Sequence, residues 1–379
     1  MAEKVQKKNT SDRIQIANLN RLNKTAALIS SKNNWFYLAI ILINLVSIFV
    51  AWLVESNGNG VATGVLGSLD YKYLYLLLIS MIIIAILKLV PDYVYLYTKS
   101  KGRKFGSVFV GNVIREYYRT LTISAEATDS LYMEKLKSSK INENTAREMV
   151  NTSGVASRLS SVLYSFVVIL LGTIFVFEST NVFLYIVAIV GFVLNLLYVL
   201  VILYFDKFKA KYLLIIGGLC KFLYRIKLVK DYEKLYNTLV VKLMQYGTVF
   251  KNNKMYMFSQ ILCGVIIKFV THLMLFFVVG ALNLTSWEIL ISILFNCVVF
   301  DIVVGFIPTP KGTLVYELLF LMLFRTIFIS GYVLYGMIAY RIIRYFAIQI
   351  VFGIGYLCGI RKQLKTINKQ LADKINSKD

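Results

Sequence analysis

The chain has 379 residues, of which 58% are hydrophobic and 16% are charged, and its mean hydropathy is +0.67. A soluble protein of this length would divide into domains with polar surfaces, so the composition argues against that class. The net charge of +22 invites a nucleic-acid function. The basic residues gather in the tails and between long apolar runs, however, which indicates membrane topology and not DNA binding. The sequence predicts an all-α, polytopic integral membrane protein built as a helical bundle.

Eight apolar runs are expected to form membrane segments. A spanning helix needs roughly 20 predominantly apolar residues, and the runs 159–177 and 182–205 supply about that number without any charge. The second run contains Lys88, Pro91 and Asp92, which leaves its cytoplasmic end open. The sixth and seventh runs are alternatively a re-entrant pair. In chain order the segments are 35–54, 73–94, 159–177, 182–205, 257–282, 287–307, 313–330 and 333–358.

Lysine and arginine set the predicted orientation, because cytoplasmic loops of membrane proteins carry an excess of both. The membrane domain is expected to span 35–360, with both termini in the cytoplasm. The basic segments assigned to the cytoplasm are 1–34, 98–158, 206–254 and 361–379. The connections without lysine or arginine are 55–71, 178–181 and 283–288.

Two of the basic segments contain amphipathic stretches. Apolar residues recur at helical spacing from Tyr232 to Phe250, which predicts a helix that either lies along the headgroups or packs under the bundle. The stretch 105–123 combines an apolar run with Arg115 and Arg119, and it predicts a short helix that dips into the membrane from the cytoplasmic side.

Residues for soluble-enzyme chemistry are scarce. His272 is the only histidine, and a satisfied interior hydrogen bond is its expected role. The cysteines stand singly, and nucleotide-binding loops, hydrolase elbows and zinc-protease motifs do not occur. We therefore expect no catalytic residue, no metal and no cofactor in this polypeptide. The cysteines are Cys220, Cys263, Cys297 and Cys358.

Ionisable residues within the last three membrane segments carry the functional prediction. Each costs roughly 2.5–3.5 kcal/mol at a helix centre, so such residues usually pair or line a polar cavity. Glu317 is expected to contact Arg341 or Arg344 across the turn at Gly331. A structural ion pair and a cavity for a charged headgroup both remain open. The residues are Asp301, Glu317, Arg325, Arg341 and Arg344.

A helix break follows the sixth segment, at Pro308, Thr309, Pro310, Lys311 and Gly312. Broken backbone at membrane depth is tolerated only where it is buried or faces water. The helix that begins after the break would point free N–H groups into it, and anions bind such helix starts. With the added charge of the lysine, the break predicts a site for a phosphodiester headgroup.

The sequence I-P-T-P-K-G-T-L-V-Y-E at 307–317 resembles the P-T-P-G-G-x-G-x-x-E signature of the lysylphosphatidylglycerol synthase transmembrane (flippase-like) family. The stretch 340–345 with Gly353 is similar to that family's later arginine–tyrosine–glycine pattern. The resemblance spans about 35–361 and is most specific in the last third. Lys311 and Leu314 replace family glycines, and the earlier Pro/Gly element within 117–137 is mostly missing. These departures imply an altered headgroup preference or a partial loss of transport.

The resemblance implies a protein of the bacterial plasma membrane that moves lysyl-phosphatidylglycerol between leaflets and so contributes to resistance against cationic antimicrobial peptides. Arg341, Arg344 and Lys311 would attract the phosphate of an anionic or aminoacylated phospholipid. Glu317 and Asp301 would balance that charge or receive the lysyl ammonium. The lysyl-tRNA-dependent domain of full-length synthases is expected to be absent, because the chain ends soon after its last helix.

Two alternatives stay open. In the first, the chain would be a phosphatidylglycerol lysyltransferase or its membrane subunit, working with a separate aminoacyltransferase domain. In the second, it would be a non-transporting scaffold or regulator, in which the buried charges only fix helix packing.

Overall fold

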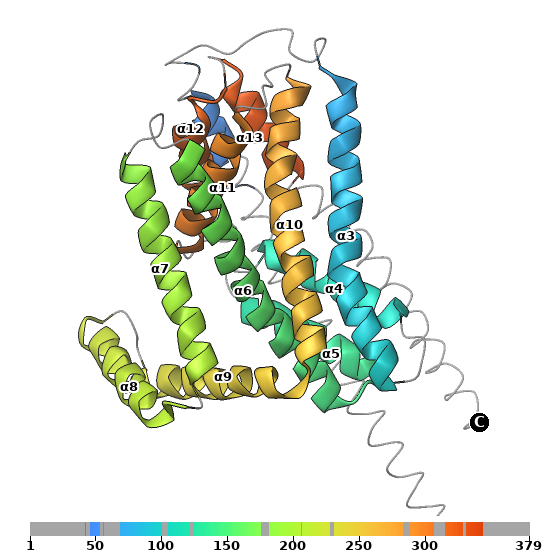
Figure 1. Cartoon of the computed structure of the whole chain (residues 1–379), viewed down its shortest axis with the longest axis vertical. Coiled ribbons are helices and arrows are strands. Elements are labelled where there is room, and N and C mark those ends of the chain that lie inside the picture. The colour runs from blue at the N-terminus through green and yellow to red at the C-terminus, as the bar shows by residue number, and fades with distance from the viewer. Residues whose placement is uncertain are drawn as a thin grey trace, which may run out of the picture.

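The computed structural model describes residues 46–53, 69–100, 105–121, 125–175, 182–205, 207–227, 231–282, 289–306, 315–328 and 331–343, together with 42 and 56. Every regular element in these ranges is a helix and none is a strand, so the all-α class is confirmed (Figure 1). The helices discussed below are α3 (Tyr71–Ser100), α4 (Phe105–Leu121), α5 (Ala125–Ser138), α6 (Glu143–Phe175), α7 (Val182–Tyr204), α8 (Lys209–Arg225), α9 (Tyr232–Asn252), α10 (Lys254–Ala281), α11 (Ile289–Phe306), α12 (Val315–Phe324) and α13 (Val333–Arg341).

Four helices are long and apolar enough to cross a membrane: α3, α6, α7 and α10. The 23 residues of α7, for example, extend about 35 Å at 1.5 Å per residue, which exceeds a hydrocarbon core of about 30 Å. These helices coincide with four of the eight predicted segments. Figure 1 shows them upright in one bundle, and α10 packs along both α3 and α6. The chain is therefore a membrane protein with at least four candidate spans.

Two of these helices extend beyond the boundaries that hydropathy suggests. The helix α6 begins at Glu143, well before the apolar run 159–177, because Ala146, Met149 and Val155 are buried at helical spacing among polar neighbours. The helix α3 likewise continues through Pro91 to Ser100. Charged residues lower the mean hydropathy of both extensions, so hydropathy does not identify their apolar faces.

The described parts of the later segments are shorter than the predicted runs. The helix α11 has 18 residues, and the ten residues of α12 reach only about 15 Å, half of a hydrocarbon core. A turn follows α12 where the prediction for 313–330 continued the helix. Most of the first segment, the end of the eighth, and both basic tails lie outside the described residues.

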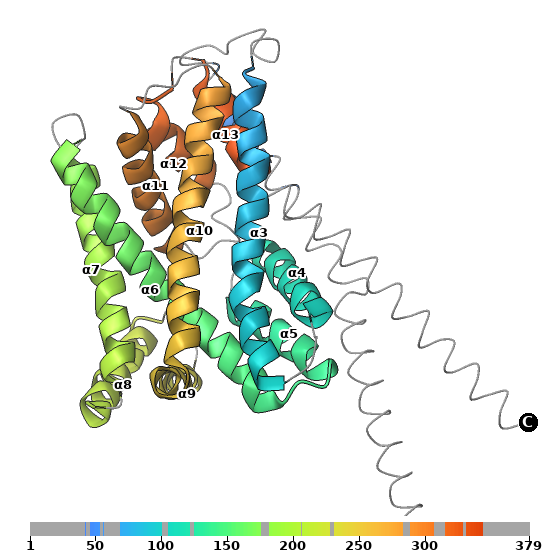
Figure 2. The ribbon, with the colours of Figure 1, turned by 45° about the vertical axis from the view of Figure 1, so that its right-hand side comes forward.

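Four helices form a layer at one end of the bundle: α4, α5, α8 and α9 (Figures 1 and 2). The helix α9 confirms the amphipathic prediction and lies across the base, in contact with α6, α7, α8 and α10. The predicted helix at 105–123 is also present, as α4, and packs on α3 and α5.

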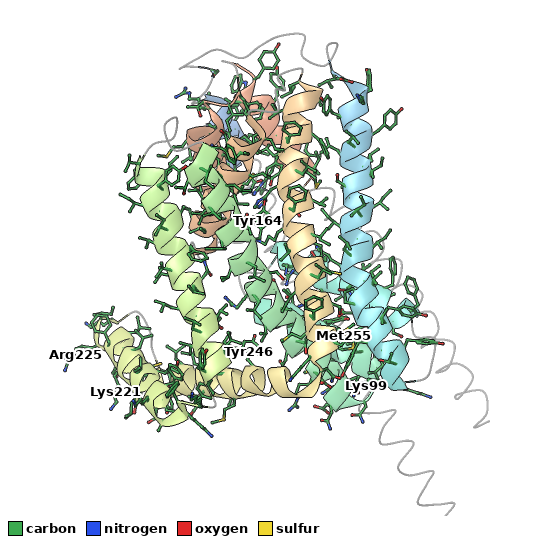
Figure 3. All side chains as sticks on the ribbon, in the orientation of Figure 1. Lys99, Tyr164, Lys221, Arg225, Tyr246 and Met255 are labelled. Carbon is green, nitrogen blue, oxygen red and sulfur yellow. The ribbon has the colours of Figure 1, made fainter. Side chains whose placement is uncertain are left out.

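The sequence analysis does not predict α8 as a separate helix. It leaves Leu214, Ile215 and Leu219 exposed, while Lys221 and Arg225 extend from the outer end of the base in Figure 3. An exposed apolar side flanked by cations is typical of a helix in the headgroup layer.

Glycines allow close helix crossings in the bundle, as small residues do in membrane proteins generally. A Cβ atom at Gly191 on α7 would overlap the side chain of Ile302 on α11. Gly191→Ala should therefore lower the free energy of unfolding by about 1–3 kcal/mol, the usual cost of overpacking.

Unfolding in lipid–detergent micelles, followed by far-UV circular dichroism, measures the effect of Gly191→Ala. The matched control is Gly218→Ala on α8, where nothing lies within 4 Å of the added atom. Equal stabilities of the two variants would contradict the close crossing of α7 and α11.

Candidate functional site

A cavity of about 490 Å³ lies between α3, α4, α6, α10 and the end of α13, and we call it the central cavity. Its volume falls within the range of small-molecule sites. Its charged lining residues are Lys88, Asp92, Arg115, Glu116, Arg119 and Lys268. Its apolar lining residues include Met81, Ile84, Ala85, Ile267, Met274 and Ile343. Two of the four cations, Arg115 and Lys268, also pair with carboxylates behind the lining, those of Asp129 and Asp301.

The antiparallel register of α3 and α10 fixes the depth of these groups. The amide of Asp70 donates to the carbonyl of Ala281 at one end, and Gln260 Nε2 donates to Asp92 Oδ1 at 2.5 Å near the other. This register places Lys268 level with residue 83, in the apolar half of α3, about 13 Å from the level of Asp92. The cavity thus has a charged end beside α4 and a mostly apolar end that contains one lysine.

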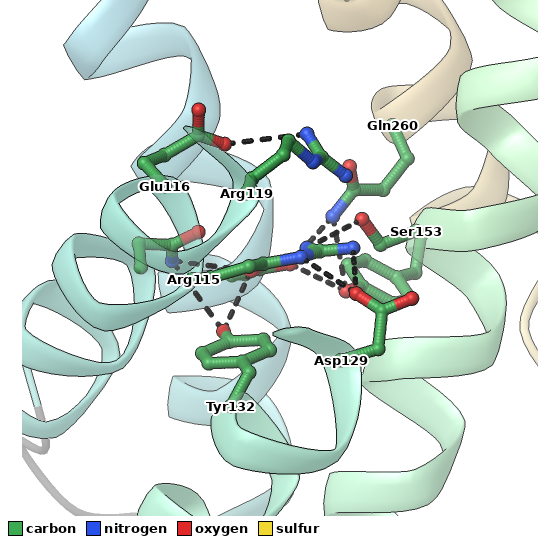
Figure 4. A network of polar contacts seen from close by, with 10 residues as sticks. Arg115, Glu116, Arg119, Asp129, Tyr132, Ser153 and Gln260 are labelled. Carbon is green, nitrogen blue, oxygen red and sulfur yellow. Dashed lines mark hydrogen bonds and ion pairs between the residues drawn. The ribbon is translucent and has the colours of Figure 1, made fainter. Parts of the chain in front are cut away.

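Asp92 is the centre of the charged end, although it is only 1% exposed. Its carboxylate accepts hydrogen bonds from the hydroxyls of Tyr132 at 2.7 Å and Tyr256 at 2.6 Å, in addition to Gln260. Asn112 lies at 3.4 Å from the same carboxylate. The network joins α3 to α4, α5 and α10 (Figure 4). Burial and the neighbouring Asp92 charge raise the pKa of Tyr132 well above its ordinary value, so this phenol stays a donor.

Arg115 is held firmly in the same network (Figure 4). Its guanidinium contacts Asp129 Oδ1 at 2.9 Å and donates to Ser153 Oγ at 2.9 Å, above the ring of Tyr132. Burial alone would lower the pKa of Arg115, but the carboxylates of Asp129 and Asp92 outweigh it and raise the pKa. Arg115 is therefore a permanent cation with fixed geometry.

Lys88 and Arg119 differ from Arg115, because they share one carboxylate. Lys88 Nζ lies 2.8 Å from Glu116 Oε2, and Arg119 Nη1 lies 3.3 Å from Glu116 Oε1. Their side chains are 28% and 34% exposed, whereas Glu116 is 10% exposed. Two partly exposed cations on one carboxylate leave positive charge available to an anionic ligand.

A second cavity of about 410 Å³ lies between α6, α7, α10 and α11, and we call it the side cavity. Lys268 lines both cavities. Its Nζ is 3.0 Å from Asp301 Oδ2, and His272 Nε2 is 3.1 Å from the same oxygen. His272 Nδ1 lies 3.0 Å from the hydroxyl of Tyr164, which Figure 3 shows inside the bundle. The expected interior hydrogen bond of His272 is confirmed.

The predicted contact between Glu317 and Arg341 is present. Arg341 Nε lies 3.3 Å from Glu317 Oε1, and both side chains are 1% exposed. The guanidinium also lies over the ring of Tyr316, 4.2 Å from its centroid. The pair links α12 to α13 within an aromatic core that includes Phe320.

The structure divides the described members of the predicted site. Asp301 lines the side cavity, Glu317 and Arg341 form the buried pair, and Arg325 is exposed in the turn after α12. The helix break Pro308, Thr309, Pro310, Lys311 and Gly312, and also Arg344, lie outside the described residues. Their roles stay predictions.

Sequence reasoning missed the central cavity as a site. Lys88 and Asp92 stand four residues apart in an apolar run, so they share a helix face, and Lys268 interrupts the run 257–282. An ionisable residue within a membrane segment is a functional candidate by default. These three residues are the available signal, although hydropathy alone gives Lys88 and Asp92 only the role of ending a segment and gives Lys268 no role.

Within the described residues, no group of three or more His, Cys, Asp or Glu side chains is arranged to hold a metal ion. Comparison of the chain with protein-family models, curated proteins and solved structures finds no match. The function is therefore inferred from the geometry of the two cavities.

Proposed function

We propose that the protein binds the phosphate-bearing headgroup of an anionic phospholipid in the central cavity and moves it between leaflets. The observation that carries the proposal is a cavity of about 490 Å³ among candidate spans, with the partly exposed cations Lys88 and Arg119 at one end and apolar side chains at the other. A phospholipid has the same division between a charged head and apolar chains. An uncharged polar solute would use neither the two exposed cations nor the apolar end.

Lys88 and Arg119 are the groups that would meet the phosphate first. Both are partly exposed, and Glu116 neutralises only one of the two charges. Charge-assisted hydrogen bonds to phosphate are about twice as strong as neutral ones. Arg115 would add fixed positive potential from behind without leaving Asp129.

The positive-inside rule supports an orientation with α4, α5, α8 and α9 on the cytoplasmic side. The charged end of the central cavity would then face the cytoplasmic leaflet, where new phospholipid headgroups are present. Lys268, deeper in the bundle, would be the next cation on the path toward the other leaflet.

Lysyl-phosphatidylglycerol is the specific lipid that the flippase-like resemblance suggests. Asp92 accepts from uncharged donors in a closed network, whereas Glu116 and Asp301 already pair with cations, so we propose the latter two for a lysyl ammonium. In this role the protein would raise the positive charge of the outer surface and reduce binding of cationic antimicrobial peptides. Cooperation with a separate aminoacyltransferase domain belongs to the same proposal.

A purely structural role for buried charges, as in the scaffold alternative, is favoured for the pair that joins α12 to α13. Glu317 and Arg341 are 1% exposed and pair in an aromatic core. We propose that this pair fixes the packing of α12 on α13 and that the headgroup binds in the central cavity.

Removing one accessible cation tests the headgroup site. Arg119→Gln should weaken binding of dihexanoyl-phosphatidylglycerol about tenfold, since a hydrogen bond between charged groups contributes about 1.5–3 kcal/mol. Titration calorimetry in phosphatidylcholine nanodiscs measures the affinity. The matched control is Arg147→Gln, because Arg147 forms a similar pair with Glu143 on the exposed surface of α6.

Two further measurements distinguish a lipid headgroup from free phosphate and binding from translocation. Inorganic phosphate should bind much more weakly than the lipid if the apolar end is occupied, and equal affinities would indicate a site for free phosphate. Vesicles that contain fluorescent phosphatidylglycerol, quenched from outside with dithionite, report translocation by the purified protein. Absence of both binding and translocation would refute the proposal.

A further inference from the structure

Arg158 is a cation of the side cavity that the proposed function does not use. It is an exposed residue of α6, and its guanidinium lies over the ring of Tyr198 on α7, 4.3 Å from the centroid. Within the described residues, no carboxylate lies at ion-pair distance from Arg158. Stacking on a ring uses the flat face of a guanidinium, so the N–H groups in its plane stay available to a ligand. Arg158 can therefore offer two parallel N–H groups to one anion.

The packing of α6 on α10 fixes the depth of Arg158. Ser160 Oγ on α6 donates to the carbonyl of Ile261 on α10 at 2.9 Å, and the two helices run in the same direction in Figure 1. Arg158 is therefore about level with Gln260, which binds the charged end of the central cavity. Lys268, which lines the deeper part of the side cavity, lies about 12 Å further along α10.

The side cavity is packed shut toward the base layer. A buried apolar cluster joins α6, α7 and α9 there. It begins at Val155, one helical turn before Arg158, so it lies between the guanidinium and α9. A water-soluble ligand that approached from the base would meet this cluster first. The buried members of the cluster are Val155, Ile202, Phe205 and Leu243.

The side cavity opens instead toward the outer surface of the bundle. Leu194 on α7 lines it and is also exposed. Gly305 on α11 lines it as well, and nothing lies within 4 Å of a Cβ atom placed there. The ring of Phe192 in the cavity lies 6.0 Å from that of Phe166, an exposed residue of α6. Exposed apolar side chains of a candidate span face lipid chains, so the opening leads into the bilayer.

We infer that the side cavity is a second binding site, for an anionic phospholipid of the leaflet next to the base layer. The phosphodiester binds Arg158, and the acyl chains leave past Phe192 and Leu194. One phosphodiester carries one negative charge, which matches the single guanidinium. A zwitterionic lipid has its own ammonium beside the phosphate and gains less from this arginine. The site is separate from the proposed headgroup site in the central cavity, and neither site requires the other.

Photo-cross-linking from inside the side cavity tests the second site. The full chain carries p-benzoylphenylalanine in place of Phe192, in nanodiscs with equal amounts of phosphatidylglycerol and phosphatidylcholine. Mass spectrometry should find about ten times more adduct with phosphatidylglycerol than with phosphatidylcholine, the ratio expected for a hydrogen bond between charged groups. The matched control has the probe at Val193, an exposed position at the same depth on α7 that does not line the cavity. This probe should capture both lipids equally.

Two variants assign the preference to Arg158. Arg158→Gln should reduce the preference at position 192 to the value at position 193, and an unchanged preference would overturn the site. Arg158→Lys keeps the positive charge and should keep the preference for phosphatidylglycerol. A loss of preference in both variants would attribute the effect to disturbed packing against Tyr198, and this result would also overturn the site.

Two further outcomes separate this site from the proposed function and from free phosphate. Arg119→Gln, which weakens the headgroup site of the central cavity, should leave the preference at position 192 unchanged. If Arg119→Gln abolished the preference, both cavities would hold one shared lipid, and the second site would be overturned. Excess inorganic phosphate at constant ionic strength should also have no effect. Competition by phosphate would overturn the lipid as the occupant.

Discussion

Asp92→Ala should destabilise the protein by about 3–5 kcal/mol, the usual cost of removing one partner from a buried charged network. The carboxylate is 1% exposed and accepts from Tyr132, Tyr256 and Gln260, which come from α5 and α10. Its loss would leave buried donors without their acceptor and would remove one of the negative charges that surround Arg115. Denaturation by SDS in lipid–detergent micelles, followed by far-UV circular dichroism, measures the change.

Two comparisons make the Asp92 result specific. Asp92→Asn keeps the size and one acceptor oxygen, so it should cost only about 1–3 kcal/mol. Glu134→Ala removes an exposed carboxylate on α5 and should change stability little. If Asp92→Ala were as stable as Glu134→Ala, the network around Asp92 would not hold α3, α4, α5 and α10 together.

The Asp92 network also shows the limit of reading this sequence. Asp92 and Gln260 are separated by 168 positions, and no spacing rule within one helix can bring them together. Hydropathy identifies α3 and α10 as candidate spans, because length and apolar content are local properties. The register between the two helices is a tertiary property, and it decides which polar residues meet.

The difference between local and tertiary properties also explains why only part of the predicted site is found together. Glu317 and Arg341 lie on consecutive helices joined by a short turn, so their contact could be predicted and is present. Asp301 was grouped with them by proximity in sequence, yet it pairs with Lys268 and His272 from α10. Buried charges could be identified from sequence, but their partners across non-consecutive helices could not.

The buried pair leads to the second large effect. Glu317→Met or Arg341→Met alone should destabilise the protein by about 3–5 kcal/mol, because each removes one member of an ion pair whose side chains are 1% exposed. The arginine left by Glu317→Met retains its contact with the Tyr316 ring, so this variant should be the less damaged of the two. Unfolding in lipid–detergent micelles gives both values.

The double variant distinguishes packing from ligand binding. Replacing both members of a buried ion pair by apolar residues of similar volume is often neutral, so Glu317→Met with Arg341→Met should recover most of the lost stability. The matched control is the partly exposed pair of Lys137 on α5 and Glu143 on α6, whose removal should show little coupling.

Translocation of phosphatidylglycerol by the double variant then decides the role of the pair. The phosphate, as proposed, binds the cations of the central cavity, and Glu317 and Arg341 are sealed within the core that joins α12 to α13. We therefore expect the double variant to translocate lipid at close to the unmodified rate. A double variant that is stably folded yet inactive would contradict this expectation. It would assign the headgroup to Arg341 and Glu317, since no loss of fold would remain to explain the loss of transport.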